Sequence, residues 1–273
     1  MGGFQVAWNT NPRPLIWCYV DNADRSSYET LYEGQLVYAA SDGVVNLGQA
    51  SGVADTSGKK VPLGVVCGQN LKEMFYSSTY KGFYITAADP HAPTQEFVLV
   101  EGQIPKGDKS AAVLVELIGP HTILKGRIFN GSYGTAITVG TVTTGSTTGA
   151  GFTCAGGLSD ATTPVADLGT VYCREGANRG IYRVTTDTSA TVKTVGQYFP
   201  YDIAVGDKFV NVQMRPIGQS YVQTDTEATF FDASANPATN YWIIDVVKLD
   251  LSMAGEEYVL FRFNADHFCK ARA

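Results

Sequence analysis

From residue 128 to residue 159 the chain carries no Asp, Glu, Lys, Arg or His, a run of 32 positions. The centre of this run, residues 133–153, is built mostly from Gly, Thr, Val and Ala. Thr and Val favour the pleated, half-buried surface of a sheet, and Thr135–Val139 alternates as a strand does. The run therefore predicts a long β-ribbon with a turn near Gly145–Gly149.

An uncharged ribbon lacks the charged side chains that protect an edge strand against pairing with another chain. Two arrangements would cover it: another element of the same chain lies against it, or a neighbouring subunit does. In a third arrangement the tip of the ribbon is disordered. The sequence leaves all three open.

Short strands separated by turn residues account for most of the remaining chain. Ser41-Asp42-Gly43 supplies an Asp-Gly turn between two of them. Helix is confined to two short candidates, Gln69–Tyr76 and Ala265–Arg272. We predict an all-β fold class with two barrel-like or sandwich-like modules in tandem, an extended N-terminal arm and very little helix. The other predicted strands are residues 35–39, 44–47, 61–67, 83–87, 96–101, 112–118, 180–185, 191–198, 208–214, 241–249 and 258–263.

One sequence motif, a turn followed by a strand, occurs twice; we call it the Gly-Asp phrase. Residues 104–119 and 203–218 agree at seven of sixteen positions, with a constant offset of 99. Both copies contain Gly-Asp, which suits a tight turn because Gly accepts positive φ and Asp binds its own backbone. The repeat reflects either convergent turn chemistry or two related modules. We predict an arm at 1–30, a first β module at 31–119 and a second β domain at 120–273.

The first 30 residues show no core of their own. Residues 9–14 hold two prolines, which remove backbone donors and favour extended geometry. Either this arm folds back on its own domain, or it lies across a neighbouring subunit, since Trp, Tyr and Arg are favoured interface anchors. The candidate subunit contacts are Trp8, Pro12, Arg13, Pro14, Trp17 and Tyr19.

Charge and hydropathy argue against several classes of partner. The net charge is −6 and no basic stripe is present, so we expect no nucleic acid as a partner. The longest apolar runs are far shorter than the roughly 20 residues of a membrane span. The N-terminus lacks the basic start and apolar core of a secretory signal. We therefore expect neither secretion through such a signal nor membrane insertion.

Five widely spaced cysteines occur, and none forms a C-x-x-C pair. A zinc or redox motif therefore has no support. We expect thiols that pack as small hydrophobic groups in a protein made in a reducing cytoplasm. A Cys154–Cys173 disulfide stays open, since adjacent strands could bring these two residues together.

A catalytic site finds little support. Only three histidines occur, and His267, between Asp266 and Cys269, is the one with reactive neighbours. Residues so close in sequence near a chain end suit an incidental cluster. Glu256 and Glu257 are adjacent, so in a strand they point to opposite faces. No phosphate-binding or dinucleotide-binding glycine motif is visible. We predict no enzyme, no catalytic or metal-binding residues and no cofactor.

Three segments carry a family resemblance. They are Glu33-Gly34-Gln35-Leu36-Val37, then Asp42-Gly43-Val44, then Val61-Pro62-Leu63-Gly64-Val65-Val66. This succession resembles the small β modules of bacteriophage head decoration (capsid cement) proteins, in which a "Gly-x-Leu-Val" strand precedes a short hairpin and a "Pro-x-Gly-Val" strand. The resemblance covers residues 31–119. The charge-poor, Gly/Thr-rich composition is also similar to that of virion structural proteins.

The resemblance implies a virion protein, made in the host cytoplasm, that binds the outer face of an icosahedral head and stabilises it. Its partners would be the major capsid protein of the same virus and further copies of itself in a homo-oligomer. The shell protein itself is a poorer match, because the common phage shell fold has a long spine helix that this sequence lacks. Two other functions stay open: a tail, tail-tube or baseplate protein, and a carbohydrate-binding adhesin module, the latter because 15 tyrosines could stack on sugars.

Overall fold

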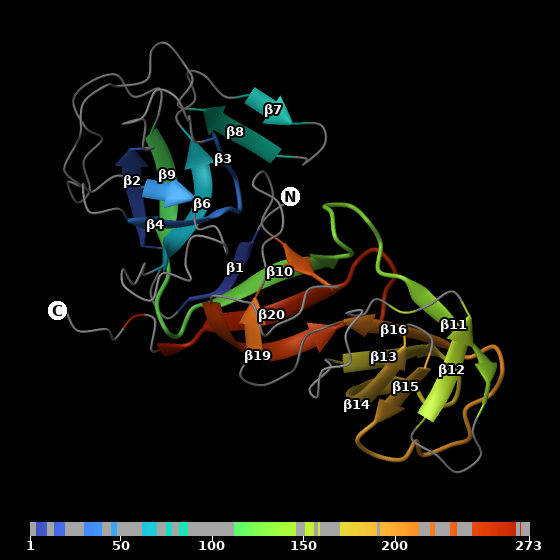
Figure 1. Cartoon of the computed structure of the whole chain (residues 1–273). Coiled ribbons are helices and arrows are strands. Elements are labelled where there is room, and N and C mark those ends of the chain that lie inside the picture. Colours follow the sequence, from blue (N-terminus) through green and yellow to red (C-terminus); the bar gives the residue numbers. More distant parts are fainter. Residues whose placement is uncertain are drawn as a thin grey trace. The chain divides into compact units, whose positions relative to one another are not determined.

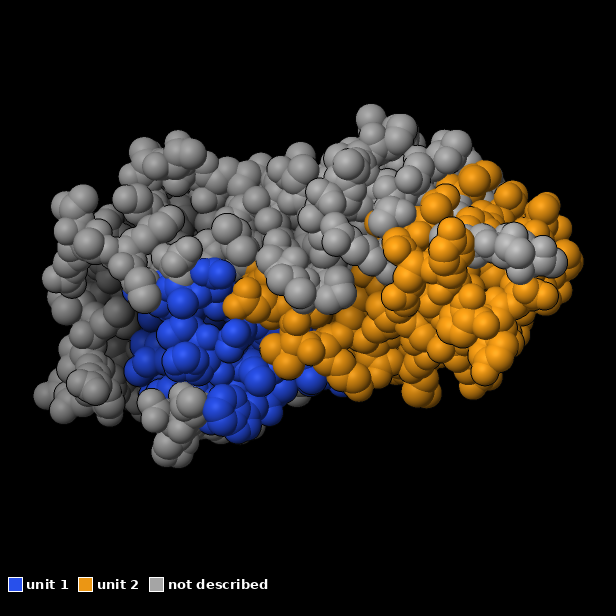
Figure 2. All heavy atoms as spheres, turned by 90° about the horizontal axis from the view of Figure 1, so that it is seen from below, with its two compact units in different colours: residues 1–126, 225–230, 260–273 blue, residues 127–224, 231–259 orange. Residues whose placement is uncertain are grey.

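A computed structural model shows an all-β protein, which confirms the predicted fold class (Figure 1). Its described part contains no α-helix. The chain forms two compact units, coloured separately in Figure 2. Unit 1 comprises residues 1–126, 225–230 and 260–273, and unit 2 comprises residues 127–224 and 231–259. The predicted boundaries at residues 30 and 119 stay predictions. The structure describes residues 4–9, 14–19, 30–39, 45–47, 62–69, 75–77, 82–86, 112–145, 151–155, 158, 170–189, 192–212, 219–221, 230–233, 242–265 and 268.

Unit 1 contains a five-stranded antiparallel sheet in the order β2-β9-β6-β4-β5. Leu36 and Val37 are adjacent in β4 and are both fully buried, as are Val65 and Val66 in β6. Because neighbouring residues of a strand face opposite sides, this sheet is covered on both faces. A separate three-stranded sheet has the order β3-β8-β7. The strands are β2 (Leu15–Tyr19), β3 (Thr30–Tyr32), β4 (Leu36–Ala39), β5 (Val45–Leu47), β6 (Pro62–Gln69), β7 (Phe75–Ser77), β8 (Gly82–Thr86) and β9 (Ala112–Leu117).

The first and third segments that carry the family resemblance lie together in this sheet, while Asp42-Gly43-Val44 lies outside the described ranges. β4 pairs with β5 on one side and with β6 on the other. Gly34 adopts a φ of 87° just before β4, and its N–H donates to the carbonyl of Val66 in β6. Glycine is favoured there because positive φ costs it little. The two strands of the resemblance, β4 and β6, are thus neighbours in one sheet.

Gly64 allows the backbones of β6 and β9 to approach closely. A Cβ atom at this position would overlap the backbone carbonyl oxygen of Glu116, whereas one at Gly119 would meet nothing within 4 Å. Gly64→Ala is therefore expected to destabilise the protein by about 1–3 kcal/mol. Gly119→Ala is expected to cost less than about 0.5 kcal/mol. Urea denaturation of both variants checks this, and equal midpoints would contradict the close approach.

The N-terminal segment folds back on its own chain. β1 (Gln5–Trp8) pairs with β10 (Ile123–Phe129), and β2 pairs with β9 along its whole length. The Phe4 ring packs edge-on against Phe261 at a centroid distance of 5.0 Å. Of the two interpretations of the arm, the described residues therefore follow the first.

A further sheet has the order β1-β10-β20-β19-β17, with β18 parallel to β10. β10 and β20 contribute residues to both units. β20 occupies residues 258–263, as predicted, and its residues Val259, Phe261 and Phe263 are buried in alternation. The remaining strands are β17 (Gln219–Tyr221), β18 (Phe231–Asp232), β19 (Trp242–Asp250) and β20 (Tyr258–Phe263).

Unit 2 contains a closed barrel in the order β11-β12-β15-β14-β13-β16, in which every pair is antiparallel. β13, β14 and β15 follow one another as neighbours, and β16 returns beside β13, which is a Greek key. The strands are β11 (Val139–Thr144), β12 (Gly151–Ala155), β13 (Thr170–Glu175), β14 (Gly180–Ser189), β15 (Val192–Val195) and β16 (Lys208–Val212).

The uncharged ribbon becomes part of this barrel. β11 and β12 pair with each other, β11 also pairs with β16, and β12 also pairs with β15. Barrel closure leaves neither strand with an open edge. The same chain therefore covers the described strands of the ribbon, while residues 146–150, 156, 157 and 159 lie outside the described ranges.

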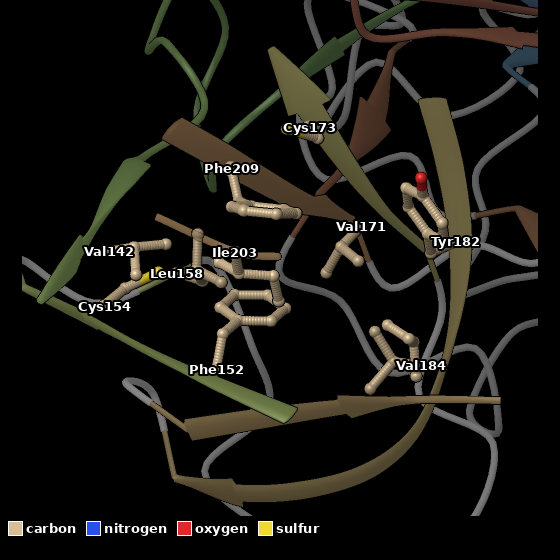
Figure 3. Close-up of a cluster of buried hydrophobic side chains, with 11 residues drawn as sticks. Val142, Phe152, Cys154, Leu158, Val171, Cys173, Tyr182, Val184, Ile203 and Phe209 are labelled. Atoms are coloured by element: carbon tan, nitrogen blue, oxygen red, sulfur yellow. The ribbon is translucent and has the colours of Figure 1, made fainter. Parts of the chain in front are cut away.

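Aromatic rings fill the barrel (Figure 3). Phe152 and Phe209 stack at 4.3 Å with 22° between their planes. Phe199 packs edge-on against both rings. Val142, Cys154, Leu158, Val171, Cys173, Tyr182, Val184, Val195 and Ile203 complete this cluster.

Two predicted elements differ from the described residues. At the two ends of the predicted helix Gln69–Tyr76, Gln69 ends strand β6 and Phe75–Ser77 is strand β7, while residues 70–74 lie outside the described ranges. The predicted strand Thr135–Val139 begins only at Val139, where β11 starts. Before it, the chain turns at Gly131 and Gly134, which both have positive φ. Of the predicted C-terminal helix, the described part shows one turn, in which the N–H of Phe268 donates to the carbonyl of Ala265.

Candidate functional site

The described residues assemble no metal-binding cluster. Within them, no three His, Cys, Asp or Glu side chains lie close enough to hold a metal ion. His121 is exposed, while His91, His267 and Cys269 lie outside the described ranges. We also find no helix in those ranges that could span a membrane.

Glu256 and Glu257 diverge, as predicted for adjacent residues. The Glu257 carboxylate is buried and pairs with the Arg174 guanidinium of β13, while that of Glu256 is largely exposed and binds Arg127 at 2.9 Å. Arg174 also donates through Nε to the carbonyl of Leu251 at 2.7 Å. The two carboxylates therefore anchor the 251–257 hairpin to two different strands and do not form a catalytic pair.

Cys154 and Cys173 both keep their thiol groups inside the barrel, so the disulfide left open by the sequence is not formed. Burial raises the pKa of Cys18 to about 12. Burial, and then the nearby Asp207 carboxylate, raise the pKa of Cys173 to about 11. Cys67 of β6 is exposed.

This difference predicts selective thiol chemistry. A thiolate is the reactive form, so Cys18 and Cys173 are expected to resist alkylation at neutral pH until the protein unfolds. Cys67 is expected to react first among the four described cysteines. Mass spectrometry after brief iodoacetamide treatment, with Cys67→Ser as the control, measures this. Rapid labelling of Cys173 in the folded protein would contradict the barrel core.

The candidate subunit contacts from the sequence are only partly described. Trp8 ends the short edge strand β1 and is 53% exposed. Pro14 is half-buried, and its carbonyl accepts from the N–H of Leu117 at 2.8 Å. Trp17 and Tyr19 lie in β2, and nothing is described of their side chains, while Pro12 and Arg13 lie outside the described ranges. Trp8 is therefore the candidate that this structure presents to a partner.

A second surface lies on the segment between β15 and β16, residues 196–207, which we call the tyrosine loop. Phe199 and Ile203 point into the barrel core and fix the loop there. Residues before, between and after these anchors face outward: Tyr198 is 76% exposed, Tyr201 64% and Val205 72%. Large apolar groups are thus held at the surface by buried neighbours.

Hydrogen bonds fix the backbone of this loop at two points. The buried Asn178 side chain donates to the carbonyls of Tyr201 and Asp202, and accepts from the N–H of Tyr201. At the other end, the Asp207 carboxylate accepts from the N–H of Ala204 at 3.0 Å. Gly206 has a φ of 98°, so this copy of the repeated Gly-Asp phrase forms the predicted turn.

Little in the sequence indicates this surface. Tyr198 falls at the end of a predicted strand, 191–198, whereas β15 ends at Val195. The Gly-Asp pair predicts a turn but not the exposed loop that this turn supports. A run of aromatic residues beside Pro200 was the available signal. The first copy of the phrase, residues 104–109, lies outside the described ranges.

Comparison of the chain with protein-family models, curated proteins and solved structures finds no match. The residues and geometry described above are therefore the basis for a functional proposal.

Proposed function

We propose that this protein is a structural component of a virus particle, which binds the outer face of a phage head and stabilises it. The observation that carries the proposal is the tyrosine loop, a fixed surface of exposed aromatic and aliphatic groups. Tyrosines are favoured anchors in protein interfaces, and fixing them beforehand lowers the entropy cost of binding. This surface suits a binding protein.

The arrangement in unit 1 supports the finer part of the proposal. The two strands of the segments that resemble head decoration proteins, β4 and β6, are neighbours in one antiparallel sheet, and β4 also pairs with β5. The partner is then the major capsid protein of the same virus, and the location is the assembled virion. Attachment as a homo-oligomer belongs to the same proposal, and Trp8 is a second exposed anchor for it.

The test is reattachment to heads assembled without the protein. Purified protein is mixed with such heads, the heads are pelleted, and the ratio of bound protein to major capsid protein is measured. We expect binding that saturates at a fixed ratio and heads that resist heating better when decorated. No binding at any concentration, with the protein shown to be folded by circular dichroism, would overturn the proposal.

The exposed tyrosines also favour a second candidate, a carbohydrate-binding module, because aromatic rings can stack on sugars. A glycan array distinguishes the two. Specific retention of one class of glycan, together with absence from heads, would favour the carbohydrate function.

A further inference from the structure

We infer that the tyrosine loop, together with the 176–180 turn beside it, is the surface that contacts the shell, and that it recognises an uncharged, partly apolar patch of protein. This inference rests on the proposed function and specifies its contact site. It assigns the attachment to unit 2. The family resemblance, in contrast, covers residues 31–119, and the candidate contacts predicted from the sequence lie in the N-terminal segment.

The chemistry of the exposed groups favours a protein over a sugar. Tyr198 and Tyr201 could stack on either, but Val205 has no hydrogen-bonding group and no aromatic face to offer a carbohydrate. An aliphatic side chain that is 72% exposed gains free energy from burial against another apolar surface. Arg179, exposed on the neighbouring turn, adds a residue type that is enriched in protein interfaces.

The low charge of the surface indicates the kind of protein patch that fits. Between residues 196 and 206 the one exposed charged side chain is that of Asp202, and the neighbouring turn contributes Arg179. The two charges are of opposite sign, so the loop attracts neither a basic nor an acidic partner strongly. Charged residues are depleted at the centre of protein interfaces. The complementary patch on the shell is therefore uncharged.

The loop is also fixed before a partner arrives. Phe199 and Ile203 pack against the barrel core, and the buried Asn178 side chain of the 176–180 turn hydrogen-bonds the loop backbone. Binding then orders few additional groups, and the tyrosines retain only two side-chain torsions each to be restricted. We expect the loop to bind without a change of backbone conformation.

The experiment compares three proteins in the reattachment assay: the wild type, Tyr198→Ser/Tyr201→Ser, and the control Val247→Ser/Leu15→Ser. The control pair is also exposed but lies on β19 and β2. The tyrosine variant is expected to bind at least about thirtyfold more weakly, as for loss of interface hot spots. The control is expected to bind like the wild type, and both variants should keep the thermal midpoint because the replaced groups are exposed.

Salt provides an independent readout. Wild-type affinity is expected to change less than about threefold between about 0.05 M and about 0.5 M NaCl, since screening weakens only charged contacts. A steep fall with salt would overturn the uncharged patch. Competition by a mixture of free oligosaccharides would overturn a protein partner in favour of a sugar.

The outcomes separate this inference from the proposed function. If the wild type does not bind heads, the proposed function fails. If the wild type binds and the tyrosine variant binds equally well, the function stands and the assignment of the contact to the tyrosine loop is wrong. Equal losses in the tyrosine variant and the control would also overturn the assignment, because the contact would then not be specific to the loop.

Discussion

Glu257→Ala is expected to destabilise the protein by about 3–5 kcal/mol, because it leaves the Arg174 guanidinium buried without its counter-charge. The same substitution at the adjacent Glu256 is expected to cost less than about 1 kcal/mol, because that carboxylate is 62% exposed. The two variants remove the same group at neighbouring positions. Guanidinium denaturation of both, followed by tryptophan fluorescence, measures the difference.

A double variant separates two contributions to the lost stability: the cost of burying the Arg174 charge without a partner, and the loss of its attraction to Glu257. Arg174→Met/Glu257→Leu removes both charges and keeps the volume of the site. It is expected to recover most of the stability lost in Glu257→Ala, since buried ion pairs often exchange with apolar groups at little cost. A double variant less stable than the single one would mean that the hairpin depends on the hydrogen bond from Arg174 to the carbonyl of Leu251.

Phe209→Ala is the second change with a large expected effect, about 3–5 kcal/mol of destabilisation. Phe209 is fully buried, and its ring stacks on Phe152 in the barrel (Figure 3). The ring also packs edge-on against Phe199. Truncation removes these contacts and leaves a cavity that the barrel can close only in part. Tyr198→Ala, on the tyrosine loop, removes an aromatic ring that is mostly exposed and is expected to change stability by less than about 0.5 kcal/mol.

The ranking of the two aromatic variants is expected to reverse when binding to heads is measured instead of stability. Phe209→Ala should bind heads normally at temperatures where it stays folded, while Tyr198→Ala should bind more weakly at full stability. Thermal unfolding by circular dichroism and the reattachment assay measure the two properties independently. A loss of stability in Tyr198→Ala comparable to that in Phe209→Ala would show that the Tyr198 ring belongs to the core.

Strand positions could be predicted from the sequence where burial alternates along a single strand. In β20 the inward residues Val259, Phe261 and Phe263 alternate with Tyr258, Leu260 and Arg262, and the predicted range matches the structure. The alternation is local, so no knowledge of neighbouring strands is needed. The Gly206-Asp207 turn was predictable for the same reason, because its chemistry lies within four residues.

The spacing of the apolar residues Leu71, Met74 and Phe75 favours a helix at Gln69–Tyr76, yet Phe75 lies in strand β7. Pairing of β7 with β8, which joins Phe75 to Tyr84, overrides that local preference. A short apolar run does not distinguish a helix from a strand when its partner is remote in sequence.

The exposed surface of the tyrosine loop could not be predicted because exposure depends on tertiary packing. Residues 198–205 contain two tyrosines, a phenylalanine, an isoleucine and a valine, and any of these could have been core residues. Barrel closure takes Phe199 and Ile203 inward and leaves Tyr198, Tyr201 and Val205 outside. The same closure covers the uncharged ribbon, which therefore needs no neighbouring subunit.

The central claim is that this protein is attached to the head of a virus particle, and the composition of purified particles tests it most directly. Particles from infected cells are separated into heads and tails, and the protein is quantified in each fraction by gel and mass spectrometry, with electron microscopy of the heads. We predict a fixed, high ratio to the major capsid protein in the head fraction and added density on the outer face. Detection only in tails, or absence from particles, would contradict the claim.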